Sequence, residues 1–349
     1  MGGPPAARAA ARSSVSAAPF IAVDAGTTRT RVWLVHDGRI LARRDAVVGA
    51  RDTARSRSTA ALGAAMHGLV AALLDDAEPG VEPRRIVAAG MITSPEGLVE
   101  VPHVLAPAGL AELAAAAEER RLPEVSDLPF VFVPGVRTAG LPGASGIGAT
   151  DVMRGEETLG VGLLRQSLLA AGGALLNVGS HWKLVRIDAA GRIAWSVTSL
   201  AGEMMHAARS DTVLASAVPD GPVPELDIAP VQDGMAEARR SGLARALFCV
   251  RLLQIGHSAG PEGRLSFLLG AFVGADLDRL EANGFLTAGE PLVVSGDEKV
   301  GGAWTVALQS RGYPVRSLSA AEVEAAFLAG LSAILDAREE RDRDVRGGC

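Results

Sequence analysis

The sequence predicts an α/β protein made of two similar halves that face each other across a cleft. The first observation is a polar turn at residues 24–28, between two apolar runs of the kind that form β-strands. The second is a turn of the same kind at residues 179–183. The third is that each turn belongs to a three-strand meander followed by alternating helices and strands. Two such halves would bring both turns to one cleft, where a small-molecule site is expected.

Composition restricts the class of protein. The chain has 349 residues, enough for two domains, and its 48% hydrophobic and 21% charged residues are typical of a globular protein. A formal net charge of -6 disfavours nucleic acid as a partner. Two cysteines are too few for a disulfide framework, which indicates a cytoplasmic protein. No window approaches the ~18 uncharged apolar residues of a membrane span, so no membrane contact is expected.

The first half is expected to begin with a disordered extension at residues 1–18 and to form a domain over residues 19–150. Ser56–Leu74 repeats apolar residues with the period of an amphipathic helix. Pro134–Gly148 is rich in glycine and proline, which predicts a surface loop near the domain boundary. The other predicted elements are the hairpin at 20–35, strands at 39–48, 85–90 and 128–133, and an alanine-rich helix at 109–121.

The second half is expected to form a domain over residues 151–340, followed by a frayed tail at 341–349. It opens with a helix that follows Thr150–Glu157 and then repeats the strand, turn and strand pattern at 174–188. The remaining predictions are strands at 193–199, 291–296 and 313–316, and helices at 202–210, 232–255, 264–282, 300–311 and 320–337.

The turn at Asp24 suits a bound phosphate. Gly26 lets the backbone approach a ligand closely, and Thr27 and Thr28 offer hydroxyl donors beside backbone N–H groups. The Asp24 carboxylate can hold Mg²⁺ through water. An ordinary β-turn with a local hydrogen bond to Asp24 explains the same residues. The hairpin alone leaves both interpretations open.

Four motifs occur in order along the chain, which they cover from about residue 20 to residue 335. They are Ile21–Thr28, Gly90–Ser94, Asp151–Thr158 and Gly179–Lys183, with weaker support from Ser199–Glu203 and Ser266–Gly270. With these motifs the chain resembles the 2-dehydro-3-deoxygalactonokinases of the sugar kinase, heat-shock ATPase and actin superfamily. The resemblance implies two actin-like (ribonuclease H-like) domains, each a mixed sheet with a three-strand meander and flanking helices.

The sequence departs from the family pattern at three places. Ala25 stands where the family commonly has Trp. Ser180-His181-Trp182-Lys183 replaces a Thr-His-Ser-Lys order, and Pro95–Glu100 follows the family's Gly-Trp-containing pattern only loosely. Since the resemblance places Pro95–Glu100 on the sugar side, that departure bears on substrate choice.

The resemblance implies a kinase that uses ATP and Mg²⁺, with Asp151 as the general base for the attacking hydroxyl. From the residues alone, Asp151 is better explained as the N-cap of a helix. Arg154, three positions later on the same helix face, would bind the carboxylate of a sugar acid with two hydrogen bonds. A surface ion pair of Arg154 with Asp151 or Glu157 is the alternative.

The other predicted site residues divide into two groups. The residues expected to bind ATP and its phosphates are Asp24, Gly26, Thr27, Thr28, Gly179, Ser180, His181, Lys183 and Gly296, with Asp24 also the Mg²⁺ ligand through water. The residues expected on the substrate side are Arg29, Arg31, Ser94, Arg154, Glu156 and Glu203. Lys183 is alternatively a side chain lying along a strand edge, and Glu203 a helix-start acid favoured by the helix dipole.

The predicted reaction is ATP-dependent phosphorylation of a 2-dehydro-3-deoxy sugar acid, foremost 2-dehydro-3-deoxy-galactonate, at its terminal hydroxyl. One alternative is a kinase for another sugar or an amino sugar. The other is a nucleotide-dependent ATPase or regulator of the same superfamily. A small-molecule sugar acid is the expected partner, and a homodimer is left open.

Overall fold

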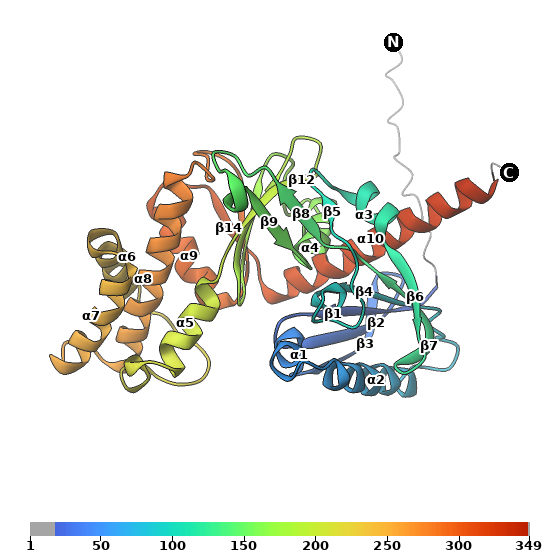
Figure 1. Cartoon of the computed structure of the whole chain (residues 1–349), viewed down its shortest axis with the longest axis horizontal. Coiled ribbons are helices and arrows are strands. Elements are labelled where there is room, and N and C mark those ends of the chain that lie inside the picture. The colour runs from blue at the N-terminus through green and yellow to red at the C-terminus, as the bar shows by residue number, and fades with distance from the viewer. Residues whose placement is uncertain (1–17, 348–349) are drawn as a thin grey trace, which may run out of the picture.

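The computed structural model describes residues 18–347, which form two α/β halves (Figure 1). The predicted fold class is confirmed, because each half contains a mixed sheet flanked by helices. Apart from Ala18, the extension predicted at residues 1–18 lies outside the described residues.

The first half is built on a six-stranded sheet in the order β3-β2-β1-β4-β7-β6. β1 pairs antiparallel with β2 and parallel with β4. Along β1, Phe20 and Ala22 belong to one apolar cluster and Ile21 and Val23 to another, because successive side chains point to opposite, covered faces. The strands are β1 (Phe20–Ala25), β2 (Thr30–His36), β3 (Arg39–Ala46), β4 (Ile86–Gly90), β6 (Glu118–Leu122) and β7 (Ser126–Phe132).

The second half repeats this arrangement in a five-stranded sheet in the order β12-β11-β10-β13-β14. β10 pairs antiparallel with β11 and parallel with β13, as β1 does with β2 and β4. The registers correspond as well, since Asp24 faces Arg31 in the first hairpin and Asn177 faces Lys183 in the second. The strands are β10 (Ala174–Val178), β11 (Trp182–Ile187), β12 (Ile193–Ser199), β13 (Leu292–Gly296) and β14 (Val315–Ser317).

A small third sheet lies between the halves and corrects the sequence prediction. It consists of β5 (Val104–Leu105), β8 (Val136–Ala139) and β9 (Thr150–Met153) in the order β5-β8-β9. β8 lies inside the segment predicted to be a loop, and β9 is a strand where a helix was expected to begin. β9 spans the predicted boundary at residues 150–151 and pairs with β8, which precedes that boundary. The boundary itself stays a prediction.

Three of the predicted helices are shortened or interrupted in the structure. The helix expected at 56–74 begins only at Ala60, because a left-handed Arg57 follows α1, which ends at Ser56. The helix expected at 232–255 is interrupted at Gly242. The helix expected at 109–121 ends at Ala116, after which β6 pairs with β7. The helices of both halves are α1 (Ala50–Ser56), α2 (Ala60–Asp75), α3 (Leu110–Ala116), α4 (Glu156–Arg165), α5 (Ala201–Ser210), α6 (Ile228–Ser241), α7 (Leu243–Ile255), α8 (Pro261–Ala282), α9 (Glu298–Ser310) and α10 (Ala320–Gly347), with short 3-10 turns η1 (Met91–Thr93), η2 (Gly146–Ala149) and η3 (Val213–Ser216).

The last helix, α10, crosses from the second half to the first (Figure 1). Trp33 of β2 donates its Nε1–H to Glu324 of α10 at 3.0 Å, and its ring centre lies 6.2 Å from that of Phe327. Further along, Arg338 donates to the carbonyl oxygen of Ala117. α10 is helical to Gly347, through most of the tail that was predicted to fray. Within residues 18–347 no helix combines the length and the apolar character needed to cross a membrane.

Candidate active site

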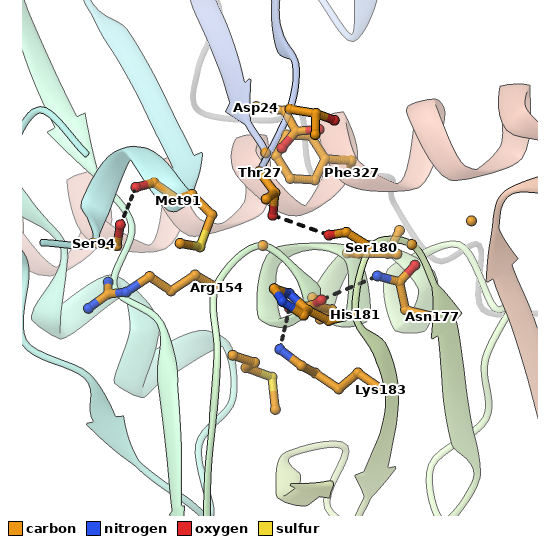
Figure 2. Close-up of a pocket in the computed structure, with 18 of the residues that line it drawn as sticks. Asp24, Thr27, Met91, Ser94, Arg154, Asn177, Ser180, His181, Lys183 and Phe327 are labelled. Atoms are coloured by element: carbon orange, nitrogen blue, oxygen red, sulfur yellow. Dashed lines mark hydrogen bonds and ion pairs between the residues drawn. The ribbon is translucent and has the colours of Figure 1, made fainter. Parts of the chain in front are cut away.

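A cavity of about 810 Å³ lies between the two halves, and both polar turns line it (Figure 2). Its volume is within the range of small-molecule sites in proteins. Every predicted site residue except Glu203 contributes to its lining. The cavity therefore brings the residues predicted for the phosphates and those predicted for the sugar to one place.

The first turn joins β1 to β2 and presents an acidic side chain next to a basic one. The N–H of Gly26 donates to the carbonyl oxygen of Arg29 at 2.8 Å, which closes the turn. Arg31 Nη2 lies 2.5 Å from Asp24 Oδ2. Burial raises the pKa of Asp24, and the charge of Arg31 opposes that rise. Arg29 is exposed and pairs with Asp45 instead, so the two arginines have different surroundings.

Two glycines let neighbouring backbone pack against this turn. A Cβ on Gly49, the N-cap of α1, would lie 2.6 Å from the carbonyl oxygen of Thr27. Because Gly49 has no side chain, Arg51 can donate its N–H to that oxygen at 2.9 Å. Gly90 ends β4 with φ +87, and a Cβ there would lie 2.6 Å from the carbonyl oxygen of Ala25. The turn is thus held from two sides.

The second turn joins β10 to β11, and an amide side chain takes the place of the carboxylate of the first turn. Asn177 occupies the position of Asp24, and its amide donates to Glu156 Oε1 at 3.2 Å. Lys183 Nζ lies 3.2 Å from Glu156 Oε2, and both side chains are largely buried. Glu156, the first residue of α4, therefore neutralises the cation of the second turn.

Two glycines also support the second turn. A Cβ on Gly202, in the first turn of α5, would lie 2.3 Å from the carbonyl oxygen of Gly179. Gly296 ends β13 with φ +115, and its Cβ would lie 2.4 Å from the carbonyl oxygen of Val178. The N–H of Glu203 donates to the carbonyl oxygen of Ser180 at 2.9 Å, as Arg51 does at the first turn.

The two turns touch each other across the cavity. Ser180 Oγ donates to Thr27 Oγ1 at 3.2 Å (Figure 2). Arg51 Nη2 of α1 lies 3.2 Å from Glu203 Oε1 of α5, and His181 Nε2 lies 3.7 Å from the same oxygen. Glu203 joins the two halves at this point and does not line the cavity.

Asp151 lies on β9, which makes two expectations about it wrong. It is not the N-cap of a helix, because α4 begins only at Glu156. For the same reason Asp151 and Arg154 do not share a helix face. Asp151 Oδ2 accepts hydrogen bonds from Ser196 Oγ and, at 2.9 Å, from Thr198 Oγ1, both on β12. These two donors fix the carboxylate at the cavity wall.

Arg154 is a half-buried cation held by neutral groups. Its Nη1 donates to Thr93 Oγ1 and its Nη2 to the carbonyl oxygen of Val101, both at 2.7 Å. Nη2 also lies 3.4 Å from His103 Nδ1. Burial lowers the pKa of Arg154, and acidic neighbours, Glu157 first, oppose that effect. Within residues 18–347 it forms no ion pair, so the predicted ion pairs with Asp151 and Glu157 are absent there.

Two further residues near Arg154 have roles within the fold. Ser94, predicted to bind substrate, lines the cavity, but its hydroxyl donates to the carbonyl oxygen of Met91 at 2.8 Å and accepts from the N–H of Glu96. Glu157 is fully buried and accepts the N–H of Gly155 on both carboxylate oxygens at 2.8 Å. Burial, and next the like charge of Glu156, raise the pKa of Glu157 to about 7.

Sequence reasoning missed several polar residues of the cavity wall, which include Asn177, His103, Thr198 and Glu324. Asn177 stands two residues before Gly179, as Asp24 stands two before Gly26, so alignment of the two hairpins would have found it. His103 follows a short irregular segment, and no spacing in the sequence marks it.

Comparison with known proteins agrees with this geometry. A solved structure titled "putative 2-dehydro-3-deoxygalactonokinase protein" from Sinorhizobium meliloti is 29% identical with a TM-score of 0.71, covering 90% of this chain and 95% of that one. The activator of 2-hydroxyisocaproyl-CoA dehydratase from Clostridium difficile is 11% identical with a TM-score of 0.51, covering 93% and 97%. The latter shows a shared fold only. Curated protein sequences give no significant match.

The repeated sheets and the cavity between them define a protein of the actin-like sugar kinase and ATPase class. A family model described as 2-keto-3-deoxy-galactonokinase matches residues 24–334, and the chain belongs to that family. It is therefore a carbohydrate kinase, as the four motifs in the sequence indicated.

Proposed function

We propose that the protein transfers the γ-phosphoryl group of ATP to the terminal hydroxyl of a 2-keto-3-deoxy sugar acid, with 2-keto-3-deoxy-galactonate the first candidate. One observation carries the proposal. In the lining of the cavity, β9 presents the carboxylate of Asp151, and the residue after β9 is Arg154, a cation without a counter-ion in the described chain. The Asp151 carboxylate can accept a proton, and the Arg154 guanidinium can bind the carboxylate of a substrate.

The phosphate side of the proposal rests on the two turns. The backbone around Gly26 and Gly179 offers room for close approach of phosphoryl oxygens, and Thr27, Thr28 and Ser180 offer hydroxyl groups. Lys183 adds positive charge, although Glu156 neutralises part of it. Gly296, where the backbone has no side chain beside the second turn, is the proposed neighbour of the adenosine.

The residues present fit a magnesium ion at the first turn. Asp24 Oδ2 is engaged by Arg31, while Oδ1 has no hydrogen bond among the described residues and can accept one from a metal-bound water. Within residues 18–347 no three His, Cys, Asp or Glu side chains form a metal-binding group, so water and phosphate oxygens would supply most ligands, as Mg²⁺ prefers. Mg²⁺, when bound, would neutralise charge on the phosphate oxygens.

Asp151 is the proposed general base. Ser196 and Thr198 hold its Oδ2, and Oδ1 is without a partner in the described chain, available to take the proton of the attacking hydroxyl. Arg154 would hold the acid end of the substrate, so that the hydroxyl at the other end lies between Asp151 and the turns. Arg31, beside Asp24, and Glu156, beside Lys183, would keep these charges in place.

The experiment is a coupled assay of ADP release with 2-keto-3-deoxy-galactonate, galactose and N-acetylglucosamine. We expect activity with the acid, and a fall in kcat of about 100- to 10,000-fold in Asp151→Asn. Asp37→Asn, in the exposed turn between β2 and β3, is the matched control and should keep wild-type activity. Full activity in Asp151→Asn would remove Asp151 from the role of base. Higher activity with a neutral sugar would favour a kinase for another sugar. ATP hydrolysis without sugar would favour a nucleotide-dependent ATPase or regulator.

A further inference from the structure

His103 is a cavity residue that the proposed reaction does not use. Backbone hydrogen bonds fix its segment, since the N–H of Val101 donates to the carbonyl oxygen of Thr93 at 3.0 Å and that of Val104 to Gly135 at 2.9 Å. The half-buried imidazole lines the cavity beside Arg154, with Nδ1 3.4 Å from Arg154 Nη2. The ring is therefore held at the wall that the acid end of a substrate would reach.

The contact with Arg154 determines which ring nitrogen carries the proton. A guanidinium has five N–H donors and no acceptor, so the nitrogen that faces it must accept. Nδ1 of His103 is therefore deprotonated. A neutral imidazole then has its proton on Nε2. Burial, and next the charge of Arg154, lower the pKa of His103 to about 4, which keeps the ring neutral at physiological pH.

Gly135 determines how the ring and the arginine lie together. A Cβ on Gly135 would be 2.9 Å from His103 Cδ2 and 2.7 Å from Arg154 Cγ, so only glycine leaves room for both side chains. One edge of the imidazole thus faces Gly135 and another faces Arg154. No described residue accepts a hydrogen bond from Nε2, and the ring lines the cavity, so the Nε2–H is available to a ligand.

We propose that His103 is a specificity-determining residue, fixed by Arg154 as the Nε2–H tautomer, that donates a hydrogen bond to an oxygen of the 2-keto acid group of the substrate. This inference rests on the proposed function. Arg154 supplies the charge, and His103 supplies a neutral donor beside it. A second cation at this place would be disfavoured by the first and by burial. An acid therefore meets two donors, whereas a neutral sugar offers no charge to Arg154.

The kinetic test compares His103→Leu, which removes the donor, with His103→Gln, which can accept from Arg154 and still donate. We expect His103→Leu to raise KM for the sugar acid by about 10- to 100-fold, with a smaller effect on kcat and none on KM for ATP. His103→Gln should recover most of the loss. His67→Gln is the control, because His67 contacts the carbonyl oxygen of Val125 and does not line the cavity.

The outcomes separate this inference from the proposed function. If the wild type phosphorylates the acid and His103→Leu keeps its KM, the role of His103 is wrong and the kinase activity stands. If the wild type phosphorylates no sugar acid, the proposed function fails, and the ligand assigned to His103 fails with it. A wild-type KM that falls as pH drops through about 6.5, with the fall absent in His103→Gln, would show an imidazolium and overturn the neutral donor.

A second measurement is independent of activity. Long-range proton–nitrogen correlation spectra of the full chain labelled with ¹⁵N-histidine report the tautomer of each ring. The His103 signal is identified by its loss in His103→Gln. We expect a neutral ring protonated at Nε2 at pH 7. A ring protonated at Nδ1, or at both nitrogens, would overturn the inference.

Discussion

The two turns that line the cavity occupy equivalent places in the repeated sheets but differ in how their charges are balanced. In the first, the acid and the base face each other on adjacent strands, as Asp24 and Arg31. In the second, Asn177 replaces the acid, and the carboxylate that meets Lys183 comes from Glu156 on α4. The backbone supports are the same, with one glycine under each turn and one at the end of the neighbouring parallel strand. The repeat has thus kept the backbone geometry of the turns and changed their chemistry.

The difference indicates that only the first turn carries a carboxylate of its own strand at the cavity. We therefore propose that a metal ion binds at the first turn rather than at the second. Three predictions test how far the equivalence extends, from the largest expected effect to the smallest.

Asp24→Asn would make the first turn like the second. We expect kcat to fall by about 100- to 1,000-fold, because charge stabilisation of the transferred phosphoryl group is lost. Asn177→Asp, the reciprocal change, places a like charge beside Glu156 but leaves Asp24 in place, so its effect on kcat should be smaller. The measurement is kcat as a function of Mg²⁺ concentration. Unchanged kcat and Mg²⁺ dependence in Asp24→Asn would show that the first turn is not the metal site.

Gly90→Ala and Gly296→Ala should be equally damaging, because both residues have positive φ and both would bring a Cβ within 2.6 Å of a backbone carbonyl oxygen. We expect each to lower the free energy of unfolding by on the order of 3 kcal/mol, from strain and collision. Gly68→Ala, in an exposed part of α2 with open space around it, is the control and should be neutral or stabilising. Urea unfolding measures all three. Tolerance of alanine at one site only would break the equivalence of the two strands.

Glu157, which follows Glu156 in α4, should make the stability of the protein depend on pH. Its pKa of about 7 in the folded state exceeds the ordinary value of 4.5, so the folded state binds more protons between these values. The free energy of unfolding should therefore fall as pH rises from about 4.5 to about 7. Glu157→Gln keeps an acceptor for Gly155 and should flatten this decline, with a gain of on the order of 1–3 kcal/mol at pH 8.

The control for this pH effect is Glu119→Gln, a change at an exposed glutamate of β6. Urea unfolding at pH 5 and pH 8 gives the comparison. The same decline in wild type and Glu157→Gln would assign the pH dependence to other groups.

Local sequence patterns were sufficient to predict the two hairpins. Their apolar runs and their Gly-centred turns are written in adjacent residues, and so is the strand that ends at Gly296. Because both hairpins end at the same edge of their sheets, the residues at 24–28 and 179–183 could be placed in one cavity from the amino-acid sequence alone.

Contacts between segments far apart along the chain determine the elements and side-chain positions that local sequence patterns did not predict. The alanine-rich segment after Gly109 has helical propensity throughout, but Glu118–Leu122 pairs with β7 and becomes a strand. Thr150–Met153 likewise pairs with β8, and this turns Asp151 toward Ser196 and Thr198 instead of capping a helix. The contacts of His103 come from Arg154 and Gly135, which lie far from it along the chain, so no short-range pattern marks it.

The crossing of α10 onto the first half has a consequence for synthesis on the ribosome. Phe20 and Ala22 of β1 share an apolar cluster with Phe327 and Leu331 of α10, and the hydrogen bond between Trp33 and Glu324 spans 291 residues of chain. At translation rates of about 5–20 residues per second, that face of the emerging sheet waits for about 15–60 s before its covering helix is made. The half that leaves the ribosome first is therefore completed last, and during that interval its uncovered apolar face is exposed to chaperones.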